Sequence, residues 1–364
     1  MAENTTETVQ IEEEKCKKVS TSIFKKRWKK FKTLKRGYIS FLAIVFLYIF
    51  SFIIPLFFGR DALMVKYNDN YYFPIFKFRL ASELGQNIQG EANYRLLKQQ
   101  YKQEDKGNWV LMPFYPYGPN ENLLDELGEG NNPPTKPDFT HWAGTDNRGR
   151  DVFVRLLYGF RIGLSFSLVV TAFSYLIAII IGAICGYFGG KVDIIIQRFI
   201  EIWSTLPFLY VIIIVSSILQ PNFFLLIIIL TMFGWIGMTY YIRGEFLREK
   251  ARDYVSAAVS MGASNRKIMF RHILPNSLTP LISYAPFTIV ANIFSLVSLD
   301  FLGFGLPPPT PSWGELMGQG LEGIDNWWLI VTPLLAMFGT LLSITFIGEA
   351  IREAFDPKVY SRLK

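Results

Sequence analysis

Few residues of this sequence have the types and spacing that a catalytic, cofactor-binding or metal-binding site requires. Residues 318–323 match the G-x-G-x-x-G pattern of dinucleotide-binding loops, and residues 189–191 (Gly-Gly-Lys) have part of a phosphate-loop pattern. No strand is expected before the first string, and Val192 follows the second where a phosphate loop has Ser or Thr. The histidines and cysteines are too scattered to indicate a metal cluster or a disulfide: His141, His272, Cys16 and Cys185. We therefore expect a chain that is not an enzyme and that binds no cofactor itself.

A polar segment between two apolar runs, residues 252–275, instead has the pattern of a contact with a partner. Its first part predicts a short helix whose apolar stripe is formed by Tyr254, Val255, Ala258 and Met261. Gly262 can adopt the left-handed conformation that ends a helix, and Ser264 can cap a second one. Pro275 is expected to mark the next boundary, because its ring disfavours helical geometry in the residue before it. Two short helices joined at a glycine favour a coupling element, while an ordinary helical loop fits this pattern equally well.

The composition predicts the class of protein that carries this segment. Half of the residues (51%) are hydrophobic, yet the formal net charge is +7. The apolar residues form runs of about 20, the length that crosses a bilayer. The sequence thus predicts an all-α integral membrane protein with six transmembrane helices, at about 38–58, 164–188, 199–219, 222–243, 277–302 and 327–348.

Lysine and arginine set the expected orientation, because they collect on the cytoplasmic side of a membrane. They are concentrated before the first span, between the fourth and fifth spans, and after the sixth. We therefore expect both termini inside, with a cytoplasmic tail and basic helix at 1–37, a cytoplasmic coupling loop at 244–276 and a cytoplasmic tail at 351–364. Residues 59–160 are expected on the far side, as a periplasmic insert and the segment leading into the five-helix permease domain at 161–350.

A basic segment before the first span carries an apolar stripe: Phe24, Trp28, Phe31 and Leu34. Such a helix is expected to lie in the lipid interface with its cations on anionic head groups. A basic flank that only orients the first span is the alternative.

The insert is too polar to span a membrane and too aromatic to be a simple linker. Its aromatic residues could build a small packed unit: Tyr71, Tyr72, Phe73, Phe76, Trp109, Phe114, Tyr115 and Tyr117. A surface for a partner or cargo and a structural cap are equally compatible with this composition. Directly after the insert, Asp146, Arg150, Asp151 and Arg155 are expected to interlock as ion pairs that order the start of the second span.

The expected spans also bear on the energy source. Spans two, four, five and six contain essentially no ionisable side chains, and the third has only Glu201 near its cytoplasmic end. Ion-coupled carriers place such residues in their pathway. Their scarcity favours an external energy source, such as a partner ATPase that acts on residues 244–276.

Several strings resemble one known family. Ala257, Ala258, Gly262, Leu274 and Pro275 occupy the positions of the "EAA" loop of ABC-importer permeases, with Ser256 in place of the usual Glu and His272 in place of the usual Ile. Residues 144–161 are similar to the "GTDxxGRDVxxRLxYGxR" run of C-type peptide permeases, and residues 299–316 and 346–357 agree with the same family. Among these, the chain looks most like the E-type branch of microcin C and oligopeptide importers.

The resemblance implies a type I ABC importer permease fold, with an interfacial elbow helix before the first span. It implies assembly with a second, B-type permease, one or two ABC ATPase subunits that hold ATP and Mg²⁺, and a periplasmic or lipid-anchored peptide-binding protein, in a bacterial inner membrane. Peptides and membrane lipids are the expected ligands, and nucleic acid is not. The ATPase-coupling interface is expected at Tyr254, Val255, Ala257, Ala258, Met261 and Gly262. An importer of nickel or a glycoside, an ion-coupled carrier and a membrane-embedded enzyme are the competing interpretations.

Overall fold

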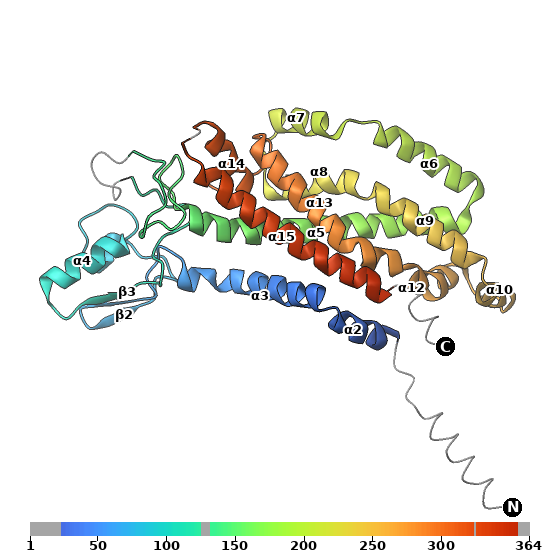
Figure 1. Cartoon of the computed structure of the whole chain (residues 1–364), viewed down its shortest axis with the longest axis horizontal. Coiled ribbons are helices and arrows are strands. Elements are labelled where there is room, and N and C mark those ends of the chain that lie inside the picture. Colours follow the sequence, from blue (N-terminus) through green and yellow to red (C-terminus); the bar gives the residue numbers. More distant parts are fainter. Residues whose placement is uncertain (1–22, 125–131, 324, 356–364) are drawn as a thin grey trace, which may run out of the picture.

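The computed structural model describes residues 23–124, 132–323 and 325–355. Long helices run roughly side by side along one axis (Figure 1). The insert lies at one end of this bundle, and the short helix α10 (Asp253–Ser260) lies at the other. The acidic N-terminal tail falls outside the described residues, as do residues 356–364 of the expected C-terminal tail, whereas residues 351–355 belong to the last helix.

Four helices are long and apolar enough to cross a membrane: α3 (Lys35–Phe57), α5 (Val152–Phe188), α13 (Thr279–Phe301) and α15 (Trp328–Phe355). Two further pairs are bent, by 68° between α6 (Gly190–Ser204) and α7 (Phe208–Ile218) and by 43° between α8 (Phe223–Gly234) and α9 (Ile236–Lys250). The count is therefore four spans, or six if each bent pair crosses once.

The helix that carries the expected second span (164–188) begins before that span. α5 begins at Val152, because the Asp151 side chain accepts a hydrogen bond from the Val154 amide (3.0 Å) and so caps the helix. Hydropathy marks only the apolar part of a helix, whereas a cap sets the end of the helix itself.

Glycines let α5 and α9 pack closely. A Cβ atom at Gly182 would lie 2.8 Å from Cβ of Ile242, and one at Gly186 would lie 2.5 Å from Cβ of Phe246. Neither contact leaves room for a larger residue, so this pair of glycines forms a helix-packing site.

The insert contains strands, so the expectation of an all-α chain is wrong here. β1 (Met64–Tyr67) pairs antiparallel with β2 (Asn70–Tyr72) and β3 (Trp109–Leu111), and α4 (Tyr94–Glu104) packs against this sheet. A 3₁₀ turn (Ala81–Leu84) completes the unit.

The packed unit exists, but its core is not the one expected. The buried residues are mostly aliphatic or lie on α4: Val65, Leu84, Leu97, Tyr101 and Val110. Five of the expected aromatic residues are exposed: Tyr71, Phe73, Phe76, Trp109 and Phe114. Composition indicates that a segment can pack, but the pleat of the sheet decides which side chains face inward.

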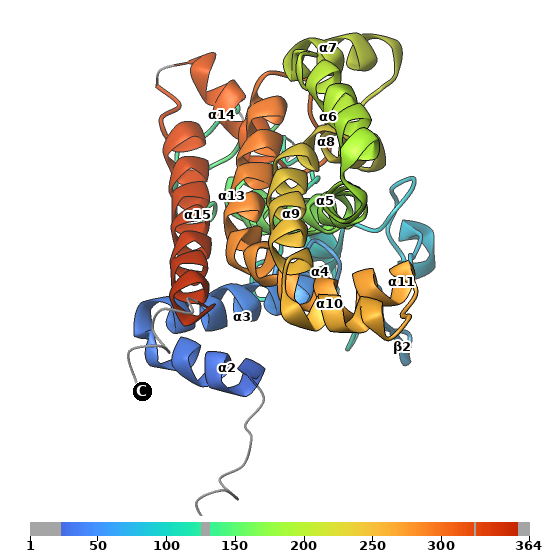
Figure 2. The same ribbon diagram turned by 90° about the vertical axis from the view of Figure 1, so that its right-hand side faces the viewer.

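α2 (Ile23–Thr33) lies beside the end of α15 (Figure 2). Phe31 is buried against Ala354 and Phe355, Lys30 pairs with Glu353 (3.1 Å), and the Arg27 guanidinium stacks over the Phe355 ring. Three further α-helices complete those of the described residues: α11 (Asn265–Lys267), α12 (Leu274–Ser277) and α14 (Trp313–Leu321).

Candidate coupling site and the polar cluster at the opposite end

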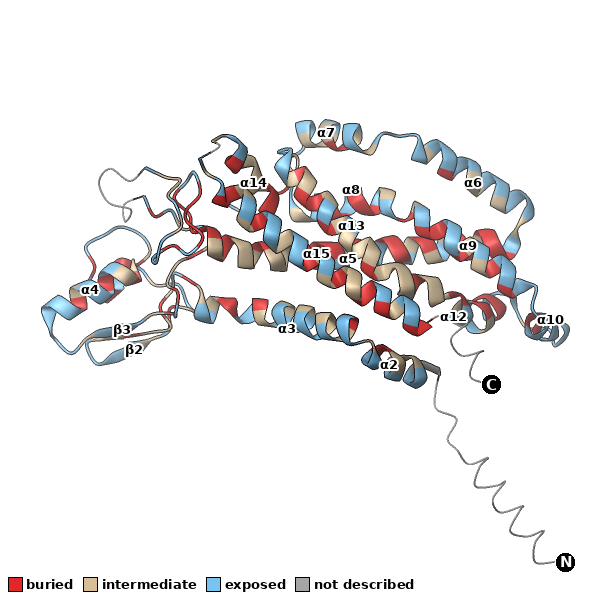
Figure 3. Ribbon diagram, in the orientation of Figure 1, coloured by how far each residue is buried: buried red, intermediate tan, exposed pale blue. Residues whose placement is uncertain are grey.

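α10 and the glycine that follows it form the turn expected from the sequence. α10 ends at Ser260, and Gly262 has a φ of 75°, a left-handed conformation that other residues rarely adopt. The Ala263 amide then donates to the Ala258 carbonyl (3.1 Å), which closes the helix end. The helix is mostly exposed at the tip of the bundle (Figure 3).

The six expected interface residues do not share one face. Val255 and Ala258 are 3% and 1% exposed, because they pack into the core of this chain with Phe246, Ile268 and Ile273. The other four, Tyr254, Ala257, Met261 and Gly262, are exposed. An apolar stripe shows that a face is covered, but not whether this chain or a partner covers it.

The outer face of α10 carries small side chains, next to the exposed Asp253 in the first turn of the helix. Ser256, Ala257 and Ser260 are all exposed and lie opposite the buried pair at helical spacing. Met261, 79% exposed, lies at one edge of this face. We call these four residues the outer face of α10.

Tyr254 is held by this chain. Its hydroxyl donates to Glu249 Oε2 (2.8 Å) and accepts from Asn276 Nδ2 (3.2 Å). Burial, ahead of the Glu249 contact, raises the pKa of the Tyr254 hydroxyl. These contacts join α10 to the last turn of α9 and to α12.

The second half of the loop differs from expectation at two points. Leu274 is helical (φ −52°, ψ −47°), so Pro275 does not end a helix, and residues Ile268–Ile273 form a π-helix before it. Asn276 Nδ2 donates to the His272 carbonyl within the same stretch (3.3 Å). Ser264 precedes α11 but makes no side-chain cap hydrogen bond.

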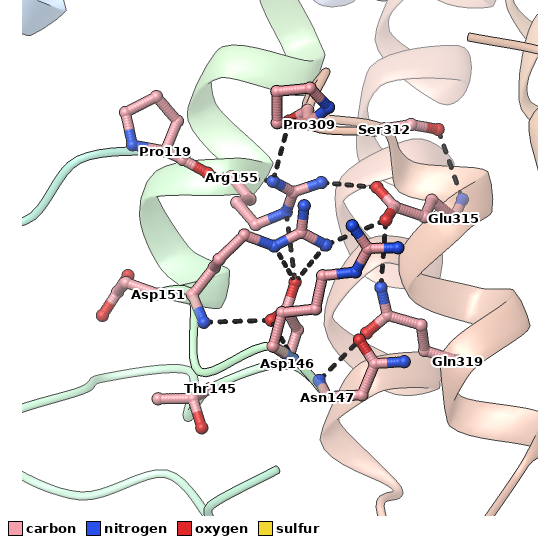
Figure 4. A network of polar contacts seen from close by, with 12 residues as sticks. Pro119, Thr145, Asp146, Asn147, Asp151, Arg155, Pro309, Ser312, Glu315 and Gln319 are labelled. Carbon is pink, nitrogen blue, oxygen red and sulfur yellow. Dashed lines mark hydrogen bonds and ion pairs between the residues drawn. The ribbon is translucent and has the colours of Figure 1, made fainter. Parts of the chain in front are cut away.

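A buried polar cluster lies at the opposite end of the bundle (Figure 4). Arg150 Nε donates to Asp146 Oδ2 (2.6 Å), and Arg155 Nε lies 3.5 Å from the same oxygen. Glu315 of α14 accepts from Nη2 of Arg150 (2.8 Å) and of Arg155 (2.5 Å). Gln319 links Glu315 to the Asn147 amide.

The expected interlocking of Asp146, Arg150 and Arg155 is confirmed, whereas Asp151 acts differently. Besides capping α5, Asp151 accepts from the Tyr115 hydroxyl (2.6 Å) and lies 2.8 Å from Nδ1 of His141. Burial raises the pKa of that hydroxyl, and the neighbouring Asp151 carboxylate raises it further.

Sequence reasoning missed Glu315, because 160 residues separate it from Arg155 along the chain. The cluster holds two arginines and two carboxylates, which balance in charge, and among the described residues Nε of Arg155 makes no hydrogen bond. We assign it the structural task of fixing α14 on the start of α5. No group of three or more candidate metal ligands occurs in the part of the chain that the structure describes.

Apolar helices of membrane length, with a short exposed helix at one end and a buried polar cluster at the other, are the features of a polytopic membrane protein. The comparisons with known proteins place it in a family. The family model described as "Binding-protein-dependent transport system inner membrane component" matches residues 178–361, and the chain belongs to this family. It is thus the membrane permease of a transport system, and its resemblance to the ABC-importer permeases is confirmed.

Three relatives cover most of the chain. The "Inner membrane ABC transporter permease protein YejE" of Escherichia coli K12 is 40% identical over 91% of this chain and 96% of its own. The "Peptidoglycan transport system permease protein YejE" of Agrobacterium fabrum is 37% identical over 92% and 93%. The "Dipeptide transport system permease protein DppC" of Bacillus subtilis is 36% identical over 69% and 77%.

Proposed function

We propose that this chain is the permease subunit of an ATP-driven importer of peptides in a bacterial inner membrane. The relatives named for dipeptide and peptidoglycan transport support a solute that contains peptide bonds. In this proposal a second permease completes the path, a binding protein delivers the peptide, and ATPase subunits hold the ATP and Mg²⁺.

The observation that carries the coupling part of the proposal is the outer face of α10. Small side chains at Ser256, Ala257 and Ser260 allow a partner to approach the helix backbone closely, and Met261 adds an exposed apolar contact at its edge. The inner face is anchored by Val255 and Ala258 in the core beside α9. A subunit seated on this face would move α9 and α12 with it.

The same proposal fixes the orientation. α10 and the basic helix α2 lie toward one end of the bundle, and the insert lies at the other (Figure 1). We place the first end in the cytoplasm with both termini, because lysine and arginine gather there. All six apolar segments then cross the membrane, α2 is the interfacial elbow, and the insert faces the periplasm.

The exposed aromatic residues of the insert support a role in contact with the binding protein or the second permease. Phe76 and Phe114 are 82% and 75% exposed. Exposed aromatic side chains of this kind are enriched where proteins meet.

Two neighbouring alanines give a matched test of coupling. Ala257→Gln adds a side chain on the outer face of α10, where the stability of the permease should change by no more than about 0.5 kcal/mol. We expect it to assemble poorly with the ATPase and to lose most peptide-stimulated ATP hydrolysis in the reconstituted complex. Ala258→Gln adds the same side chain to the core and should instead destabilise the permease, by about 1–3 kcal/mol.

The measurements are co-purification of the ATPase, ATP hydrolysis and thermal stability of the permease. Wild-type coupling in Ala257→Gln would show that the outer face of α10 is not the docking surface. Equal thermal stability of the two variants would contradict the placement of Ala258 in the core and of Ala257 on the outer face of α10.

A further inference from the structure

The break between α6 and α7 leaves backbone groups open within a pair of helices that together are long and apolar enough to cross a membrane. The two helices bend by 68° across Thr205, Leu206 and Pro207, near the middle of the stretch from Gly190 to Ile218. Hydrogen bonds between residues three apart end α6: the Thr205 amide donates to the Ile202 carbonyl and the Leu206 amide donates to the Trp203 carbonyl, both at 3.2 Å. Pro207 has no amide hydrogen with which to continue the ladder.

Two carbonyl groups at this break have no partner. Across the described residues, no hydrogen bond reaches the carbonyl oxygen of Thr205 or of Leu206. The segment is also uncovered, because Ser204, Thr205, Leu206 and Pro207 are all exposed. In lipid such a backbone is unstable, since hydrocarbon offers no hydrogen-bond donor; it persists where protein buries it or where water fills a cavity beside it.

At the neighbouring break, between α8 and α9, side chains donate hydrogen bonds to the backbone. There the carbonyl oxygen of Met232 accepts hydrogen bonds from the indoles of Trp235 (2.8 Å) and Trp203 (3.0 Å). Trp203 belongs to the last turn of α6, so the two breaks lie side by side. The chain thus supplies donors to the second break from its own side chains and leaves the first one open.

We infer that residues 204–207 line the water-filled path by which the solute crosses the membrane. This inference rests on the proposed transport function and extends it to named groups. Water satisfies open carbonyls in any number, whereas a covering subunit would have to place a donor at each one.

The groups at the break favour ligands that donate hydrogen bonds. The hydroxyls of Ser204 and Thr205 already donate to the carbonyls of Glu201 (2.8 Å) and Ile202 (2.7 Å), which leaves their oxygen lone pairs as acceptors. Together with the two open carbonyls they form a row of acceptors on one exposed segment. The amide hydrogens and the terminal ammonium group of a peptide fit such a row whatever side chains the peptide carries.

Cysteine accessibility in the assembled complex tests this assignment. The background variant carries Cys16→Ser and Cys185→Ala, and the probes are Ser204→Cys and Thr205→Cys. The control is Phe46→Cys, in the middle of α3, where the native side chain is 66% exposed on an unbroken helix. The reagent is a small, charged methanethiosulfonate added to membrane vesicles.

We expect both probes to react at least about ten-fold faster than the control, because only the thiolate reacts and one unit of thiol pKa changes its fraction ten-fold. Apolar surroundings raise that pKa, whereas water does not. Reaction at the control rate by both probes, in the resting complex and with ATP and vanadate, would mean that the second permease or lipid covers the break, and would overturn the inference.

A second arm separates this inference from the proposed substrate. Tri-alanine, added with the binding protein, is expected to slow modification of Ser204→Cys. If modification is fast and tri-alanine does not slow it, residues 204–207 still line the path, and the assignment of peptides as the solute is refuted. If the cysteine probes do not react but peptide uptake is normal, the assignment of residues 204–207 to the path is refuted and the assignment of peptides as the solute stands.

Discussion

Neutralising Glu315 tests the polar cluster that joins α14 to α5. In Glu315→Gln the side chain keeps its shape and loses its charge. Arg150 and Arg155, which are 3% and 0% exposed, then face the single carboxylate of Asp146. The substitution therefore leaves one buried positive charge without a counter-charge.

The expected cost follows from that imbalance. Removing one partner of a buried ion pair costs about 3–5 kcal/mol, and the 14% exposure of the Glu315 side chain places it at the lower end, at about 3 kcal/mol. At about 2–4 °C per kcal/mol, the melting temperature should fall by about 6–12 °C. The assay is thermal unfolding of the purified complex, followed by the fraction of permease that remains soluble.

Two variants make the result specific. Glu322→Gln removes an exposed charge beside the end of the same helix and should change stability by no more than about 0.5 kcal/mol. Adding Arg150→Gln to Glu315→Gln restores charge balance and should recover about 1 kcal/mol or more of the loss. The reasoning fails if Glu315→Gln has the same melting temperature as Glu322→Gln. It also fails if the stability lost in the double variant equals the sum of the stabilities lost in Glu315→Gln and Arg150→Gln.

Three further results are expected. Gly262→Val should uncouple ATP hydrolysis from transport at a local cost of about 1–3 kcal/mol, because a β-branched residue resists a φ of 75°, and Gly262→Asn should retain more coupling. Wild-type coupling in Gly262→Val would contradict this. Deleting residues 62–136 with a short linker should preserve ATPase assembly and impair peptide uptake, so normal uptake would make the insert dispensable. In intact cells an impermeant thiol reagent should label Asn70→Cys and not Ser361→Cys, whose position lies outside the described residues; the reverse pattern would invert the topology.

Local chemistry made several elements predictable. Gly262 was assigned to a left-handed turn because few other residues adopt that conformation without strain. Asp146, Arg150 and Arg155 were expected to pair because they are close in sequence at the start of a helix. Gly182 and Gly186 are spaced one helical turn apart, which indicates a helix contact, because only small residues allow one so close.

Other features depended on contacts that the sequence does not encode locally. Glu315 completes the cluster from a helix far along the chain, so no short pattern could reveal it. Pro275 looked like a boundary, but Leu274 before it is helical and follows directly on a π-helix.

The sequence by itself determined the class of this protein and where its long apolar helices lie, because a backbone in lipid must satisfy its own hydrogen bonds and long apolar runs therefore become helices. It also determined the family, through strings of residues at fixed spacing. The tertiary structure alone decided which side of each helix is free. Val255 and Ala258 lie on the same apolar stripe as Met261, but α9 and the π-helix cover the first two and leave the third exposed, since periodicity defines a face without naming what packs on it.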